Sequence, residues 1–158
     1  MTAQLAVEVV LTIPDNEAET ALATLARLGV PLGGLERADL YRFEIELVEI
    51  EPVEREALLA ALRSLETIYN PNKHALRVRA EPAPQPGELW VDEIHPAAAA
   101  ARGPVRIAGR TLGGVRAVER FTAWRVVDAE GRPAAAEVVA LAAETLLCNP
   151  AFQRSQRV

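Results

Sequence analysis

The sequence has little of what marks secreted, membrane or nucleic-acid-binding proteins. Its 158 residues include one cysteine, Cys148, so no internal disulfide can form. No apolar run approaches the roughly 18–20 residues of a membrane helix, and no signal-peptide pattern precedes the first expected strand. The net charge is −5, whereas a duplex-binding surface needs clustered positive charge. We therefore expect a cytoplasmic protein that binds neither membranes nor nucleic acid.

Recognisable catalytic motifs are also lacking. His74 and His95 lie far apart in the sequence, without the spacing that brings two metal ligands onto one helix face. Cys148 follows an apolar helical pattern, which favours a small buried residue over a nucleophile. There is no nucleophile elbow and no phosphate loop with its lysine. We therefore expect no catalytic, cofactor or metal site in this chain, and we leave open whether it takes part in an enzyme.

The composition is that of a folded protein with an uneven charge. Half of the residues are hydrophobic and a quarter are charged. Residues 1–80 hold 13 acidic and 8 basic residues, and residues 81–158 hold 9 of each, so the first half carries the whole net charge. Sixteen of the seventeen basic residues are arginine, with Lys73 the only lysine. Because arginine binds carboxylates through two parallel hydrogen bonds, such a surface is compatible with protein contacts.

Alternating and helical periodicities predict a strand–helix–strand–helix–strand order in the first half. Asp15 is a suitable N-cap for the first helix. The expected elements are a strand at Leu5–Ile13, a helix at Asn16–Leu28, a strand at Tyr41–Leu47, a helix at Val53–Tyr69 and a strand at Leu76–Ala80.

A proline-rich segment, Glu81–Gly87, follows and predicts a stiff linker able to span about 20 Å. The same order then recurs. The expected elements are a strand at Leu89–Ile94, a helix at Ala97–Leu112, a strand at Val115–Val127, a helix at Pro133–Leu147 and a strand at Phe152–Val158. Apolar residues occupy both faces of the Val115–Val127 strand, which either is covered on both sides or bends into a hairpin.

Three short motifs recur at nearly constant distance and indicate an internal duplication. The pairs stand 80, 78 and 79 residues apart and keep the same order: Leu32–Leu35 with Leu112–Val115, Arg42-Phe43 with Arg120-Phe121, and Asn70-Pro71 with Asn149-Pro150. A unit of 70–80 residues buries only a small core. We therefore expect an α+β, two-layer sandwich in which residues 1–80 and 88–158 are tandem β-α-β-α-β units that pair as a pseudo-dimer, with residues 81–87 as linker.

Seven residues are candidates for contact with a partner. Arg102, Arg106 and Arg110 recur every four residues, so on the expected helix they form one stripe, either a solvated face or a contact for an acidic protein. Each Asn-Pro pair stands after a helix and acts either as a stop signal or as a binding loop. The remaining candidates are Arg42 and Arg120, with Asn70 and Asn149 from the Asn-Pro pairs. Gly113-Gly114 we interpret as a helix exit rather than a phosphate-binding turn.

Two segments resemble PurS, the small subunit of bacterial and archaeal phosphoribosylformylglycinamidine synthase. They are Leu146-Leu-Cys-Asn-Pro150 and the glycine-led Gly103–Gly113 followed by Val115–Val127. The first half is similar at Leu28-Gly29 and Ile68-Tyr-Asn-Pro71. The resemblance covers nearly the whole chain as two PurS-like copies.

This resemblance implies a subunit without chemistry of its own. PurS proteins pair and bridge the glutaminase and the ATP-dependent synthetase subunits of the complex, which makes an amidine in purine biosynthesis. The family's Asp-Pro-x-Gly segment is absent from the first copy, where Pro14–Glu19 stands, and only Arg102-Gly103 matches its end in the second. If those loops contact the larger subunits, binding at one copy is altered. Further self-association is left open.

Two other classes of function remain. Tandem units that share a sheet can bind an amino acid or nucleotide, as ACT-like regulatory domains do. The glycine loop expected after the first strand of such domains is replaced here by Pro14-Asp15 and Ile94-His95-Pro96. The third class is an enzyme of unfamiliar type, built on scattered carboxylates and the two separated histidines.

Overall fold

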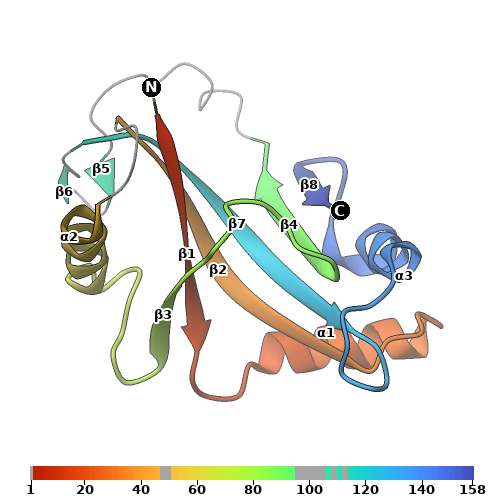
Figure 1. Ribbon diagram of the computed structural model, residues 1–158. Helices are drawn as coiled ribbons and strands as arrows, with labels where there is room; N and C mark the ends of the chain where they lie inside the picture. The colour runs from red at the N-terminus through yellow and green to blue at the C-terminus, as the bar shows by residue number, and fades with distance from the viewer. Residues whose placement is uncertain (1, 47–50, 95–105, 108–109, 112–113) are drawn as a thin grey trace. The chain divides into compact units, whose positions relative to one another are not determined.

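The computed structural model describes residues 2–46, 51–94, 106–107, 110–111 and 114–158, and the chain is an α+β protein (Figure 1). None of the described helices is long and apolar enough to cross a membrane. The elements are β1 (Ala3–Leu11), α1 (Asn16–Arg27), β2 (Gly34–Ile45), α2 (Pro52–Arg63), β3 (His74–Val78), β4 (Glu88–Glu93), β5 (Arg106–Ile107), β6 (Arg110–Thr111), β7 (Val115–Val127), α3 (Ala136–Ala142), the π-helix η2 (Ala143–Leu147) and β8 (Gln153–Arg157).

Six strands form one antiparallel sheet in the order β3-β1-β2-β7-β4-β8, and β5 and β6 form a separate two-stranded sheet. The register pairs Val9 with Leu76 between β1 and β3, and Val91 with Ser155 between β4 and β8. The α+β class expected from the sequence is thus confirmed. The expected strand at Val115–Val127 is present with these bounds, as a single strand with Phe121 and Trp124 both buried.

By its internal contacts the chain forms two compact units. One contains Met1–Ile13, Leu40–Pro82 and Pro96–Arg120, and the other contains Pro14–Asp39, Ala83–His95 and Phe121–Val158. Each unit therefore takes residues from both halves of the sequence. Strands β2 and β7 run through both units. The division into repeats at residues 81–87 concerns the origin of the chain and stays a prediction.

The core of the first unit lies between β1 and α2. Leu5, Val7 and Val9 alternate along β1 and pack against the apolar side of α2, where Leu62 is fully buried. Helix α2 starts with Pro52 in its first turn, and the Glu54 carboxylate accepts a hydrogen bond from the Glu51 N–H at 3.0 Å. The helix ends at Arg63 rather than at the expected Tyr69, although Leu65 and Ile68 beyond it are still buried in this core.

The core of the second unit is built from α1, the α3–η2 helix and the adjacent strands. Helix α1 begins where the sequence predicted, because the Asp15 carboxylate accepts hydrogen bonds from the N–H groups of Glu17 (3.1 Å) and Ala18 (3.2 Å). Members of this core on the helices and strands include Leu25, Leu89, Trp124, Val126, Val139 and Leu147. One contiguous apolar cluster thus joins elements that are distant in the sequence.

The expected helix at Ala97–Leu112 is wrong over residues 106–107 and 110–111, which form the strands β5 and β6. Arg106 pairs with Thr111 and Ile107 with Arg110 in antiparallel register. Pro104 and Gly109 oppose a continuous helix, and the β-branched residues around them favour strands. The rest of this expected helix lies outside the described residues.

Candidate partner-binding surface

The two Asn-Pro motifs form the same turn. The Asn70 side-chain oxygen accepts a hydrogen bond from the Asn72 N–H at 2.9 Å, and the Asn70 carbonyl accepts one from the His74 N–H at 2.8 Å. The Asn70 N–H in turn donates to His74 Nδ1 at 2.9 Å. The asparagine therefore builds the turn with its own side chain.

The turn at Asn149 repeats this pattern bond for bond. The Asn149 side-chain oxygen accepts from the Ala151 N–H at 3.0 Å, and its carbonyl accepts from the Gln153 N–H at 2.8 Å. The Asn149 N–H donates to Gln153 Oε1 at 2.8 Å. Asn149 and Pro150 are exposed, whereas Asn70 is half-buried. The backbone after each asparagine is presented at the surface, and the asparagine oxygen is used within the turn.

Arg42 on β2 and Arg120 on β7 each contact a residue of the other arginine's strand within the first unit. Arg42 Nε donates to the Glu119 carboxylate at 2.7 Å, and Arg42 Nη1 donates to the Pro82 carbonyl at 3.2 Å. The Arg120 guanidinium lies 5.8 Å from the centre of the Tyr41 ring. The Arg42 side chain is only 14% exposed, while Arg120 is an exposed residue. Of the two, Arg120 is better placed to contact another protein.

The predicted arginine stripe is not formed. Arg106 and Arg110 belong to the strands β5 and β6, so the spacing of four residues does not place them on one helix face. Arg102 lies outside the described residues. The expectation of a helical contact stripe is therefore wrong for Arg106 and Arg110, because Pro104 and Gly109 oppose a continuous helix there.

The groups considered for chemistry have structural surroundings. The His74 ring accepts a hydrogen bond inside the first Asn-Pro turn, and Cys148 packs half-buried against the core of the second unit. His95 lies outside the described residues. Among the residues that the structure describes, no three His, Cys, Asp or Glu side chains are grouped so as to hold a metal ion.

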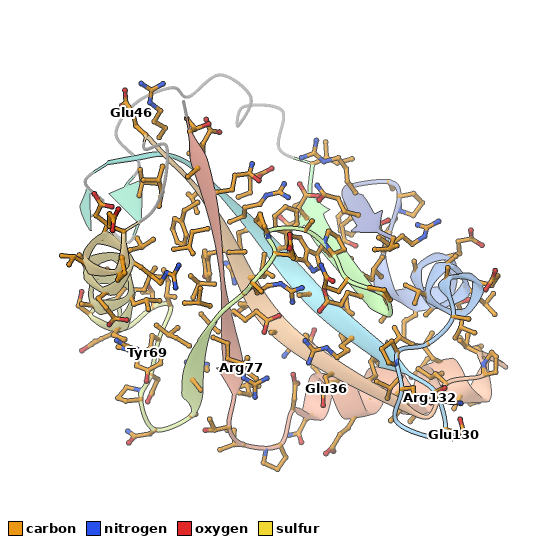
Figure 2. All side chains as sticks on the ribbon, in the orientation of Figure 1. Glu36, Glu46, Tyr69, Arg77, Glu130 and Arg132 are labelled. Atoms are coloured by element: carbon orange, nitrogen blue, oxygen red, sulfur yellow. The ribbon has the colours of Figure 1, made fainter. Side chains whose placement is uncertain are left out.

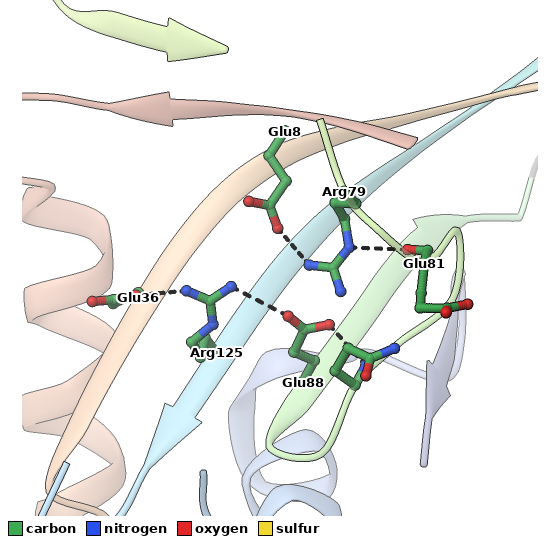
Figure 3. A network of polar contacts seen from close by, with 7 residues as sticks. Glu8, Glu36, Arg79, Glu81, Glu88 and Arg125 are labelled. Atoms are coloured by element: carbon green, nitrogen blue, oxygen red, sulfur yellow. Dashed lines mark hydrogen bonds and ion pairs between the residues drawn. The ribbon is translucent and has the colours of Figure 1, made fainter. Parts of the chain in front are cut away.

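Two buried glutamates anchor the proline-rich segment, a feature that sequence reasoning missed. In the first unit Arg79 Nη1 donates to the Glu8 carboxylate at 2.7 Å, and Arg79 Nε donates to the Glu81 carbonyl at 3.3 Å (Figure 3). In the second unit the Glu88 carboxylate accepts from the Gln85 N–H at 2.9 Å and pairs with Arg125 at 3.3 Å. The segment therefore has a fixed start and a fixed end. A glutamate at alternating strand spacing gives no signal of burial in the sequence.

Arg37 organises the start of α1 in the second unit. Its Nε and Nη2 atoms donate to the two Asp15 carboxylate oxygens at 3.0 and 3.1 Å, it pairs with Glu17, and its guanidinium lies 5.9 Å from the centre of the Trp124 ring. Burial raises the pKa of Asp15, but Arg37 and the N–H groups of Ala18 and Glu17 more than offset this and hold the pKa below its ordinary value. Asp15 was predicted as an N-cap, whereas its partner 22 residues later left no local signal.

Exposed charges of both signs pair along the turns and strand ends, where side chains project from the ribbon (Figure 2). Glu46 pairs with Arg116, and Arg132 pairs with Asp128 and Glu130 between β7 and α3. The N–H of Arg132 is the main group that lowers the pKa of Asp128. The described surface is therefore mixed in charge at these places.

No known protein family, curated protein or solved structure matches this chain.

Proposed function

We propose that this chain is a non-catalytic assembly subunit of phosphoribosylformylglycinamidine synthase. It would act as two fused PurS-like copies and bridge the glutaminase and the ATP-dependent synthetase during purine biosynthesis. The proposal joins the sequence resemblance of the Asn-Pro motifs to one structural observation, the order of the strands in the sheet.

That order reads the same from both edges. The first half of the chain contributes β3-β1-β2 and the second half contributes β7-β4-β8. If β1, β2 and β3 correspond to β4, β7 and β8, each strand has its counterpart at the same distance from the middle. A two-fold axis between two equal subunits gives this order, which supports a covalent pair of duplicated units.

Local contacts support the same correspondence. The turn at Asn70–His74 equals the turn at Asn149–Gln153 with a shift of 79 residues. With a shift of 78 residues, Glu119 is the counterpart of Tyr41, and Arg120 is the counterpart of Arg42. Arg42 pairs with Glu119, and the Arg120 guanidinium lies over the Tyr41 ring. In a two-fold interface, residue i of one subunit contacts residue j of the other and the reverse contact is also made. The arginine pair follows this rule.

The first test is capture of partners from the native cytosol with the full chain as bait. Recovery of a glutaminase and an ATP-dependent synthetase, with glutamine-dependent amidation restored on recombination, is the expected result. Arg120→Glu should weaken partner retention, and Arg63→Glu, an exposed arginine on α2, serves as the matched charge-reversal control. A chain that retains neither enzyme would end the assembly role. Stabilisation of that chain by amino acids or nucleotides would then favour the regulatory alternative.

A further inference from the structure

The second unit contains a hollow of about 390 Å³ that the assembly role does not use. One wall is α1, the floor is the paired strands β4 and β7, and the opposite wall is η2 with the start of β8. Its size falls within the range of small-molecule sites in proteins. The residues that line it come from both halves of the sequence, which is why no local motif indicated it.

The α1 wall offers hydrogen-bond acceptors. Glu17 is the one charged residue among those lining the hollow, and its side chain is 67% exposed. It pairs with Arg37, which also holds Asp15, so these three side chains together carry one net negative charge. The hydroxyls of Thr20 and Thr24 donate to the carbonyls of Asn16 and Thr20 at 2.7 and 2.8 Å. Their protons are thereby used, and the oxygen lone pairs remain as acceptors. This wall suits a group that donates hydrogen bonds, above all a cation.

Donor groups lie elsewhere around the hollow. Gln153 Oε1 accepts the Asn149 N–H, so its amide NH₂ group is left as a donor. The Thr122 hydroxyl on β7 also lines the hollow, and within the part of the chain that the structure describes it makes no side-chain hydrogen bond. A ligand with an acceptor such as a carbonyl oxygen would match these two groups.

The remaining surface is apolar. Leu147 and Trp124 are buried, and Leu146 is 43% exposed, unusually open for a leucine beside a core. Both leucines belong to the π-helix η2, where the Cys148 N–H donates to the Ala143 carbonyl at 3.1 Å, a five-residue step. Such π segments are rare and occur frequently at functional sites. An aliphatic group placed here would cover Leu146 and contact the indole.

We propose that this hollow binds a small organic amine with a branched aliphatic body and a hydrogen-bond acceptor, the chemical class of an apolar amino-acid amide. The ammonium group meets the acceptors of α1, the aliphatic body packs on Leu146, Leu147 and Trp124, and the acceptor meets Gln153 or Thr122. An anion of the same shape is disfavoured by the net negative charge of Asp15, Glu17 and Arg37. The inference stands independently of the assembly role, because the hollow lies in one unit and its test needs no partner.

The test is an NMR titration of the full ¹⁵N-labelled chain with three molecules of one shape: L-leucinamide, L-leucine and 4-methylpentanoate. The indole N–H of Trp124 should shift saturably with L-leucinamide, less strongly with L-leucine and not with 4-methylpentanoate. The indole of Trp90, which packs on Phe121 and does not line the hollow, is the internal control. No saturable Trp124 shift, or equal binding of the anion, would overturn the proposal.

Variants add a second criterion. Glu17→Gln should weaken L-leucinamide binding about three- to fivefold, the scale of an exposed ion pair, while Glu19→Gln on the same helix should leave it unchanged. Thr20→Phe places a ring over the hollow from an exposed helix position and should abolish the Trp124 shift, with folding checked by circular dichroism. Equal effects of Glu17→Gln and Glu19→Gln would show non-specific charge attraction and refute the assigned site.

Discussion

The ion pair of Glu8 and Arg79 gives a stability prediction with a definite magnitude. Both side chains are nearly buried, at 8% and 9% exposed, and Arg79 Nη1 lies 2.7 Å from the Glu8 carboxylate. In Arg79→Met the carboxylate stays in the interior without its guanidinium. Removing one partner of a buried pair typically destabilises a protein by about 3–5 kcal/mol. We expect a loss of this size, which is a large part of the roughly 5–15 kcal/mol that stabilises a typical domain.

The double variant Glu8→Leu/Arg79→Met separates the loss of the whole pair from the loss of the guanidinium alone. Two apolar residues of similar volume avoid the desolvation of both ions, and such replacements are often neutral or stabilising by about 1–4 kcal/mol. We therefore expect the double variant to recover most of the stability lost in Arg79→Met. Arg116→Met is a comparison at a surface pair, because Arg116 and Glu46 are 54% and 59% exposed, and should leave the stability nearly unchanged.

Urea unfolding followed by far-ultraviolet circular dichroism is the appropriate assay. Both tryptophans, Trp90 and Trp124, belong to the second unit, so fluorescence reports on that unit while the substitution lies in the first. A loss below about 1 kcal/mol in Arg79→Met would contradict the buried character of the pair. A double variant as unstable as the single one would show that lost packing, rather than a buried carboxylate without Arg79, causes the loss.

Three further predictions concern local interactions. The pKa of Asp15 in the folded chain lies below its unfolded value of about 3.9. The contribution of the ionised Asp15 to stability is therefore complete above a pH of about 3.9 and disappears as the pH falls through the folded-state pKa. Asp15→Asn should flatten this acid dependence in urea unfolding. Gly33→Ala drives a Cβ atom into the Asp128 carbonyl oxygen and should lower the free energy of unfolding by roughly 1–3 kcal/mol in thermal melts. Asn70→Ala and Asn149→Ala each remove the same side-chain hydrogen bond and should each lose about 0.5–1.5 kcal/mol, with the larger loss at the half-buried Asn70; no loss at either position would contradict the role of the asparagine in its turn.

Local signals in the sequence predicted much of the secondary structure. The strand expected at Val115–Val127 has the bounds of β7, although its two apolar faces had left a hairpin open, and Asp15 before an amphipathic run gave the start of α1. These signals succeed because strand alternation and N-caps depend on neighbouring residues only. They fail where two local preferences compete. The spacing of Arg106 and Arg110 matches a helix, whereas Pro104 and Gly109 oppose one, and the described residues there are strands.

The candidate site was predicted less well, since its contacts join distant residues. The Asn-Pro turns were found because each is built within five residues. The contacts of Arg37 with Asp15 and of Arg79 with Glu8 span 22 and 71 residues, and a pattern read along the chain carries no record of them. The same holds for the hollow, whose wall residues Thr20 and Leu146 come from opposite halves.

The composition of the two compact units leads to a last prediction, for the isolated first half. Residues 1–80 lack the partners of α1, because the core around Leu25 is completed by Leu89, Trp124 and Leu147 from the second half. A monomer of this fragment would leave the apolar side of α1 exposed. A pair of identical fragments can cover it, if the second half is a diverged copy of the first. We therefore expect the fragment to fold only as a homodimer.

Its melting temperature should then rise with fragment concentration, as mass action requires for a dimer that dissociates on unfolding. Sedimentation equilibrium over the same range measures the association directly. Leu25→Asp removes the apolar contact and should abolish both folding and association, whereas Glu19→Gln on the exposed side of the helix should preserve them. A folded monomer with a concentration-independent melting temperature would refute the prediction that each half needs the other to complete its core. It would also weaken the proposal of a fused pair, since a self-sufficient half has no need of its copy.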